Sequence, residues 1–140
     1  MENKYFTPDI EDVHVGYELE WKCKIRNQDW EKTICDTDLI SIIYDEYEHA
    51  DFEEPYDEQF RVPYLTKEQI EAEGWSKAKV PIVTIKHDFY EIPYIKDNFR
   101  IDYNFKNKLI NILENNGVNL FYGKCKDINT FRKIIKLLGI

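Results

Sequence analysis

The chain has 140 residues, of which 43% are hydrophobic and 15% aromatic, and its formal net charge is −8. This composition supports a packed core and excludes a disordered acidic tail, which would lack the aromatic residues. No apolar run approaches the roughly 20 residues of a membrane span and no signal peptide opens the chain, so we expect a cytoplasmic protein without membrane association.

The first third of the chain predicts a β-hairpin followed by a helix. Apolar and polar residues alternate over residues 13–26, which predicts a long half-buried antiparallel strand with a bend at Gly16. Residues 27–29 form the expected turn, and residues 30–35 the returning strand. Asp36 or Thr37 can then cap a short helix whose apolar side chains recur at spacings of three and four, as far as Tyr47.

The rest of the chain predicts more strands and two further helices. Residues 60–64 indicate an edge strand, because Pro63 has no N–H to donate to a sheet. Thr66 and Gln69 form a capping box for a helix that Gly74 ends. Strands are expected at 80–85, 89–95, 99–105, 109–113 and 118–122, with a hairpin turn at 115–117. A last helix runs from Asp127 to Gly139.

Together these elements indicate an α+β fold. We expect a single domain over residues 1–140, built from a twisted antiparallel sheet of about six or seven strands with three short helices. The negative charge is not spread evenly over this chain. Residues 33–60 carry ten acidic side chains and no lysine or arginine, whereas residues 106–140 carry seven basic and two acidic ones.

Residues 45–58, the acidic segment, place carboxylates among aromatic rings. Uncompensated carboxylates repel one another and cost stability, and rings beside them could occupy a groove that normally holds phosphates and stacked bases. The alternative is a solubilising loop over a helix whose tyrosines face the core. If the segment binds a partner, the residues that we expect to do so are Asp45, Glu46, Glu48, Asp51, Glu53, Glu54, Tyr56, Asp57 and Glu58.

A second charged group lies near the C-terminus and defines the basic patch. It could meet the phosphates of RNA or DNA, or it could be the ordinary polar face of an amphipathic helix. The basic patch consists of Lys124, Lys126, Arg132, Lys133 and Lys136.

Catalytic motifs are absent from the sequence. There is no P-loop, GxGxxG or GxSxG pattern, and no paired histidine spacing. We therefore expect no enzyme activity, no cofactor and no metal. The chemistry that stays open is a metal or acid–base site at His14, Glu18 and Glu20 on one strand face, an oxygen-rich metal site at residues 49–53, and a thiol at Cys125 beside a helix N-terminus. All three cysteines are expected to be buried free thiols.

Three segments carry a resemblance. They are residues 5–21 (YFTPDIEDVHVGYELEW), 60–75 (FRVPYLTKEQIEAEGW) and 123–140 (GKCKDINTFRKIIKLLGI). Together they are similar to segments of a group of small proteins encoded by phages and prophages. Small acidic proteins of such genomes include inhibitors of host defence, anti-CRISPR proteins among them. The resemblance implies no catalytic residue.

These observations favour a non-enzymatic inhibitor of anti-CRISPR type. Its expected partner is a host protein with a basic nucleic-acid-binding groove, such as an RNA-guided nuclease with its guide RNA. The acidic segment would engage that groove and interfere with the binding of guide or target nucleic acid. The alternative is an accessory protein that binds RNA or DNA through the basic patch.

Overall fold

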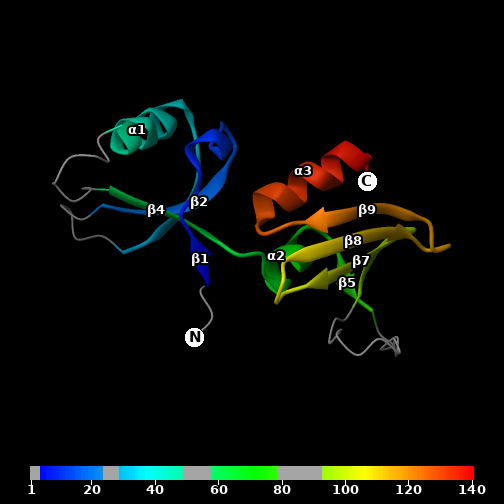
Figure 1. Cartoon of the computed structure of the whole chain (residues 1–140). Coiled ribbons are helices and arrows are strands. Elements are labelled where there is room, and N and C mark those ends of the chain that lie inside the picture. The colour runs from blue at the N-terminus through cyan, green and yellow to red at the C-terminus, as the bar shows by residue number, and fades with distance from the viewer. Residues whose placement is uncertain (1–3, 24–28, 49–57, 79–92) are drawn as a thin grey trace. The chain divides into compact units, whose positions relative to one another are not determined.

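The computed structural model describes residues 4–23, 29–48, 58–78 and 93–140. The chain divides into two compact units, unit 1 (Met1–Tyr64) and unit 2 (Leu65–Ile140). The α+β class and the antiparallel pairing are confirmed. The strands form two sheets rather than one, with nine strands in the described residues instead of six or seven, and the three expected helices are present (Figure 1).

Unit 1 is a four-stranded sheet with one helix. Its strands are β1 (Tyr5–Phe6), β2 (Glu18–Cys23), β3 (Glu31–Ile34) and β4 (Glu58–Pro63), in the spatial order β1-β4-β2-β3. A short 3-10 helix, η1 (Ile10–Asp12), follows β1, and α1 (Thr37–Glu48) lies over one face of the sheet (Figure 1). The core of the unit forms where that face meets α1, and it includes Leu19, Ile43, Phe60 and Val62.

Two strands of unit 1 differ from the sequence prediction. β2 begins at Glu18 rather than at residue 13, because the chain turns at Gly16, whose φ is +94° and whose N–H donates to the Cys35 carbonyl at 2.9 Å. The edge position predicted for residues 60–64 is wrong, since β4 has β1 on one side and β2 on the other. Pro63 is tolerated because the pairing of β4 with β2 ends at Arg61.

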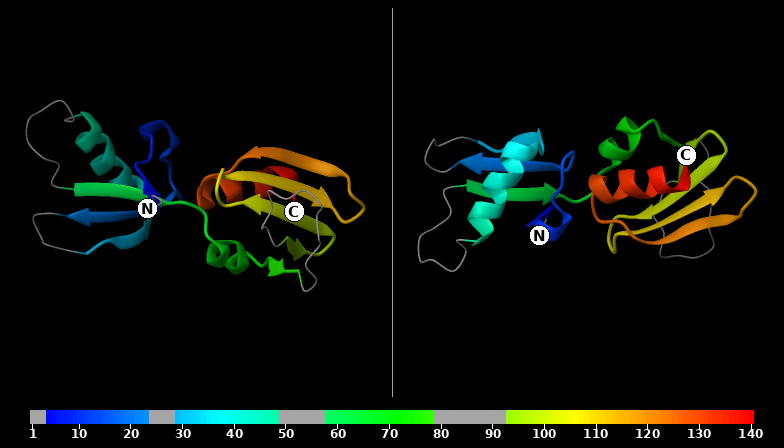
Figure 2. Two further views of the ribbon diagram at one scale, coloured as in Figure 1. Left: turned by 60° about the horizontal axis from the view of Figure 1, so that its bottom comes forward. Right: turned by 90° about the horizontal axis from the view of Figure 1, so that it is seen from above.

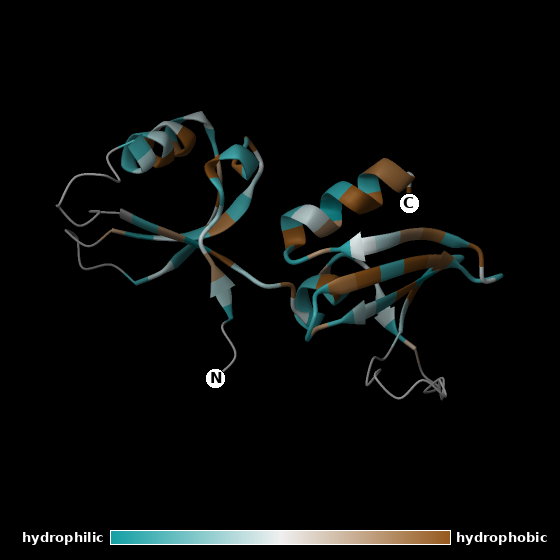
Figure 3. Cartoon of the chain, viewed as in Figure 1, coloured by the Kyte–Doolittle hydropathy of each residue, from teal (hydrophilic) through white to brown (hydrophobic). Residues whose placement is uncertain are grey.

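Unit 2 is a five-stranded meander with two helices. In chain order it contains α2 (Lys67–Ala72), β5 (Ser76–Lys77), β6 (Tyr94–Lys96), β7 (Phe99–Asn104), β8 (Leu109–Glu114), β9 (Asn119–Lys124) and α3 (Ile128–Leu138). The strand order in space is β5-β6-β7-β8-β9. Figure 2 shows α3 lying across this sheet, and the alternation of apolar and polar residues along α3 is visible in Figure 3. The core includes Trp75, Ile101, Tyr103, Ile112 and Phe131.

The predicted helix ends and hairpin of unit 2 are confirmed. Thr66 and Gln69 form a reciprocal capping box, with hydrogen bonds of 3.2 and 3.1 Å. Asp127 caps α3, and Gly139 ends it with a φ of +74°. Gly117 takes a φ of +92° in the β8–β9 turn. The strand predicted at 80–85 and most of the one predicted at 89–95 lie outside the described residues.

Of the helices in the described parts of the chain, none combines the length and the apolar character that crossing a membrane requires.

Candidate functional site

The structure places both ends of the acidic segment in unit 1. Asp45, Glu46 and Glu48 form the last turn of α1, where Asp45 and Glu48 are exposed and Glu46 is half-buried. Glu58 is the first residue of β4. The remaining predicted partner-binding residues, Asp51, Glu53, Glu54, Tyr56 and Asp57, lie outside the described residues.

The acidic turn lies at the unfavourable end of α1. The backbone dipole makes a helix C-terminus partly negative, so that lysine or arginine is preferred there, yet no basic residue occupies the last turn of α1. The same helix exposes two large apolar side chains, Ile42 (39% exposed) and Tyr44 (43%). The end of α1 therefore combines carboxylates and apolar surface in an arrangement that helix stability does not require.

We expect the substitution Glu48→Gln to stabilise the free protein. Removing a charge from the negative end of α1 should raise the free energy of unfolding by about 0.3–1 kcal/mol at low ionic strength. Urea denaturation measures this change. Asp38→Asn is the matched control, because Asp38 lies in the favourable first turn and its neutralisation should act in the opposite direction. A destabilised Glu48→Gln protein would contradict the argument.

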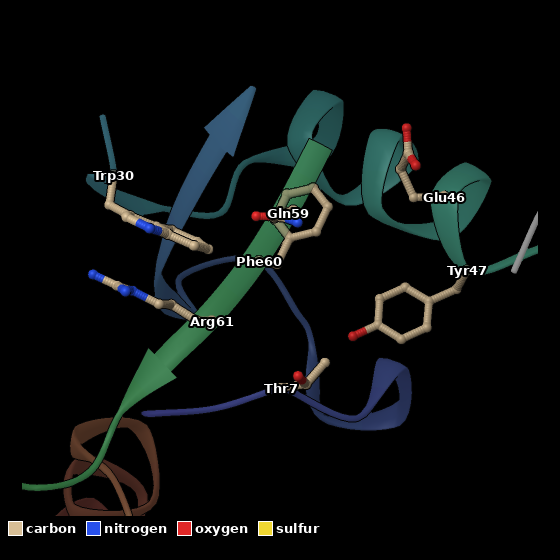
Figure 4. A pocket seen from close by; sticks show the side chains of 7 residues that line it. All are labelled: Thr7, Trp30, Glu46, Tyr47, Gln59, Phe60 and Arg61. Carbon is tan, nitrogen blue, oxygen red and sulfur yellow. The ribbon is translucent and has the colours of Figure 1, made fainter. Parts of the chain in front are cut away.

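A pocket of about 360 Å³ lies between the two ends of the acidic segment (Figure 4). The end of α1 contributes Glu46 and Tyr47, and the start of β4 contributes Gln59, Phe60 and Arg61. The Tyr47 hydroxyl donates a hydrogen bond to the carbonyl oxygen of Pro8, which fixes that ring. Seven of the described residues line it, namely Thr7, Trp30, Glu46, Tyr47, Gln59, Phe60 and Arg61.

Arg61 is held by two rings and a carboxylate. Its guanidinium carbon lies 3.6 Å from the centre of the Tyr5 ring and 4.0 Å from that of Trp30. Its Nη2 and Nε both approach Oε1 of Glu20, at 2.7 and 2.8 Å, and Glu20 is its direct partner in the β2–β4 register. Figure 4 shows the Trp30 and Arg61 side chains lying against each other. The charge of Arg61 is thus compensated, and one wall of the pocket is fixed in place.

The basic patch is partly occupied by contacts within unit 2. Lys124 Nζ donates to the carbonyl oxygen of Asn107 at 3.0 Å, and Arg132 forms an ion pair with Glu73. Lys133 and Lys136 are exposed on α3. Lys126, also exposed, lies between β9 and α3. The five residues of the basic patch therefore lie at the end of β9, in the connection that follows it, and on α3. Nucleic-acid binding through them stays a prediction.

The expected strand face of His14, Glu18 and Glu20 is not formed. His14 lies outside β2, in the turn before it, and its Nδ1 is 2.9 Å from the carbonyl oxygen of Val15. Glu18 pairs with Lys32 at 3.5 Å, and Glu20 with Arg61. Over the described ranges, no three His, Cys, Asp or Glu side chains are grouped so as to hold a metal ion. Residues 49–53, the other metal candidate, lie outside those ranges.

The cysteines are free and buried, as predicted. Burial raises the pKa of the Cys125 thiol to about 12, and the neighbouring Asp127 carboxylate adds to the shift. Burial, with a contribution from Asp36, likewise raises the pKa of Cys35 to about 11. Both thiols are therefore protonated at neutral pH, which is the opposite of what a nucleophile needs.

Comparisons with protein-family models, with curated proteins and with solved structures give no significant match to this chain.

The pocket was not predicted from the sequence. Trp30 and Phe60 are assigned to strands by their alternation, and nothing in the local pattern sets them apart from core residues. A usable signal was the single arginine of β4, since Arg61 is the first lysine or arginine after 28 positions without either. A cation at the edge of so acidic a region indicates a structural ion pair, and Glu20 supplies the partner.

Proposed function

We propose that this protein is a non-enzymatic inhibitor that binds a basic nucleic-acid-binding groove of a host protein. The observation that supports this proposal best is the surface of α1, where exposed Asp45 and Glu48 in the last turn follow exposed Ile42 and Tyr44 and no cation occupies that turn. Carboxylates placed where they weaken a helix favour a role outside the folding of this chain.

The chemistry of such a surface requires no catalytic group. Ten carboxylates within residues 33–60 would steer the protein towards a cationic groove and compete there with phosphates. Exposed rings and aliphatic side chains would add apolar contacts that slow dissociation. The resemblance to phage and prophage proteins supports an RNA-guided nuclease as the class of partner, and hence an anti-CRISPR role.

Competition with nucleic acid tests this proposal. Purified RNA-guided nucleases, each with and without guide RNA, would be titrated with the protein at about 0.05 M and about 0.3 M salt. We expect a complex with at least one of them that weakens at the higher salt and that guide or target nucleic acid displaces. The proposal fails if every complex found is insensitive to both salt and nucleic acid, or if none of the nucleases binds.

A further inference from the structure

The pocket of unit 1 is lined by residues from both ends of the acidic segment. Glu46 and Tyr47 precede the segment's central part in the chain, and Gln59 and Phe60 follow it. A volume of about 360 Å³ is at the lower end of the roughly 300–1,000 Å³ typical of ligand sites. It suits a single amino-acid side chain rather than a whole element of secondary structure.

The lining favours a cation over an anion. Arg61 is the basic residue among the seven, and its Nε and Nη2 are already directed at Glu20 while Tyr5 and Trp30 lie against its guanidinium. An incoming anion would therefore find the charge of Arg61 compensated. Glu46 supplies a carboxylate, and the rings of Tyr47, Phe60 and Trp30 supply apolar and π surface.

Among cations, the guanidinium group fits this lining best. It is planar, it stacks on aromatic faces, and it can donate two parallel hydrogen bonds to one carboxylate. The neighbouring Tyr5–Arg61–Trp30 stack, with Glu20 as its carboxylate, is the same chemistry within the chain itself. Glu46 has contacts within the chain, but a carboxylate offers about four acceptor positions and can take a guanidinium in addition.

We propose that this pocket receives an arginine side chain from the partner's basic groove. The inference rests on the proposed function for the identity of the partner. In the bound state the guanidinium would lie against the ring of Tyr47, on the same side of β4 as Glu46 (Figure 4), and donate to the Glu46 carboxylate. The charge of the acidic segment would attract the groove as a whole, and the pocket would fix the register by selecting one arginine within it.

The free protein and a small probe test the pocket directly. N-acetyl-arginine methylamide would be titrated into the ¹⁵N-labelled full chain and followed by NMR at the Trp30 indole N–H and the Tyr47 and Phe60 amides. We expect saturable shifts at these positions. The citrulline analogue, which has the same shape without the charge, should bind at least about fivefold more weakly, because a charge-assisted hydrogen bond is lost.

Two single substitutions on α1 separate binding of the arginine probe in the pocket from its general electrostatic attraction to the acidic surface. Glu46→Gln should weaken binding of the arginine probe by about fivefold, whereas Glu48→Gln, which removes an equal charge outside the pocket lining, should leave it within about twofold. Equal losses in both variants, equal binding of the citrulline analogue, or shifts scattered over the chain would overturn the inference. If that happens while nuclease binding stays competitive with nucleic acid, the proposed function stands and the pocket assignment alone is wrong.

Discussion

Neutralising four carboxylates of the acidic segment is expected to weaken the complex with the partner by about 100-fold. The variant is Glu53→Gln, Glu54→Gln, Asp57→Asn and Glu58→Gln. An ion pair at a solvent-exposed interface contributes roughly 0.2–1 kcal/mol, so four of them together account for about two orders of magnitude in affinity. Most of the change should be in the association rate, because these charges steer the encounter.

The measurement is the binding affinity at low and at physiological salt, with circular dichroism as a check that the variant is folded. A control is needed to separate the effect of net charge on the affinity from the effect of where the charges lie. A control protein with Glu11→Gln, Glu68→Gln, Glu71→Gln and Asp97→Asn loses the same four charges from exposed positions elsewhere. We expect the control to bind within about threefold of the wild type. If it weakens as much as the first variant, the acidic segment is not the recognition surface.

Local chemistry explains which parts of the fold could be predicted. The capping box at Thr66 and Gln69, the Asp127 cap and the Gly117 turn depend on residues within a few positions of one another. The same holds for α1, whose Asp36 carboxylate accepts from the Leu39 N–H at 2.8 Å. Side-chain hydrogen bonds and positive φ angles are encoded at those positions, whatever the rest of the chain does.

The arrangement of the strands depends on distant residues, and there the sequence was less informative. Whether β4 lies inside the sheet or at its edge is decided by Tyr5 and Phe6, which pair with Pro63 and Val62 from almost sixty positions away. The alternation over residues 13–26 continues through Gly16 although the strand does not, because a turn forms there that the hydrogen bond from the Tyr17 N–H to the His14 carbonyl closes at 3.0 Å. Periodicity records which face a residue occupies, and it does not record where pairing stops.

The pocket could not be predicted for the same reason. Its residues come from four separate places in the chain, namely Thr7 after β1, Trp30 before β3, the end of α1 and the start of β4. Only the spatial order β1-β4-β2-β3 brings Trp30 and Tyr5 to opposite sides of the Arg61 guanidinium. The predicted acidic residues, by contrast, could be chosen from composition alone, because charge density is a property of the local sequence.

Replacing Phe131 with alanine is expected to lower the free energy of unfolding of unit 2 by about 3–5 kcal/mol. Phe131 is 1% exposed, and its ring meets that of Trp75 edge to face, with centroids 6.4 Å apart and an interplanar angle of 75°. The substitution removes a ring from the layer between α3 and the sheet and leaves a cavity that the rigid meander β7–β8–β9 cannot close.

Urea denaturation measures this loss of free energy, and hydrogen exchange of the β7 and β8 amides assigns the loss to unit 2. Leu137→Ala is the matched control. Leu137 lies on the same helix but is 77% exposed, so its truncation should change stability by no more than about 0.5 kcal/mol. The urea m-value should stay constant, because the surface exposed on unfolding hardly changes. Similar losses in the two variants would mean that α3 is held by its helical propensity rather than by the packing of Phe131 against Trp75. In that case side-chain packing would not hold α3 against the sheet, and the basic residues of α3 would lack the fixed positions that the nucleic-acid-binding alternative requires.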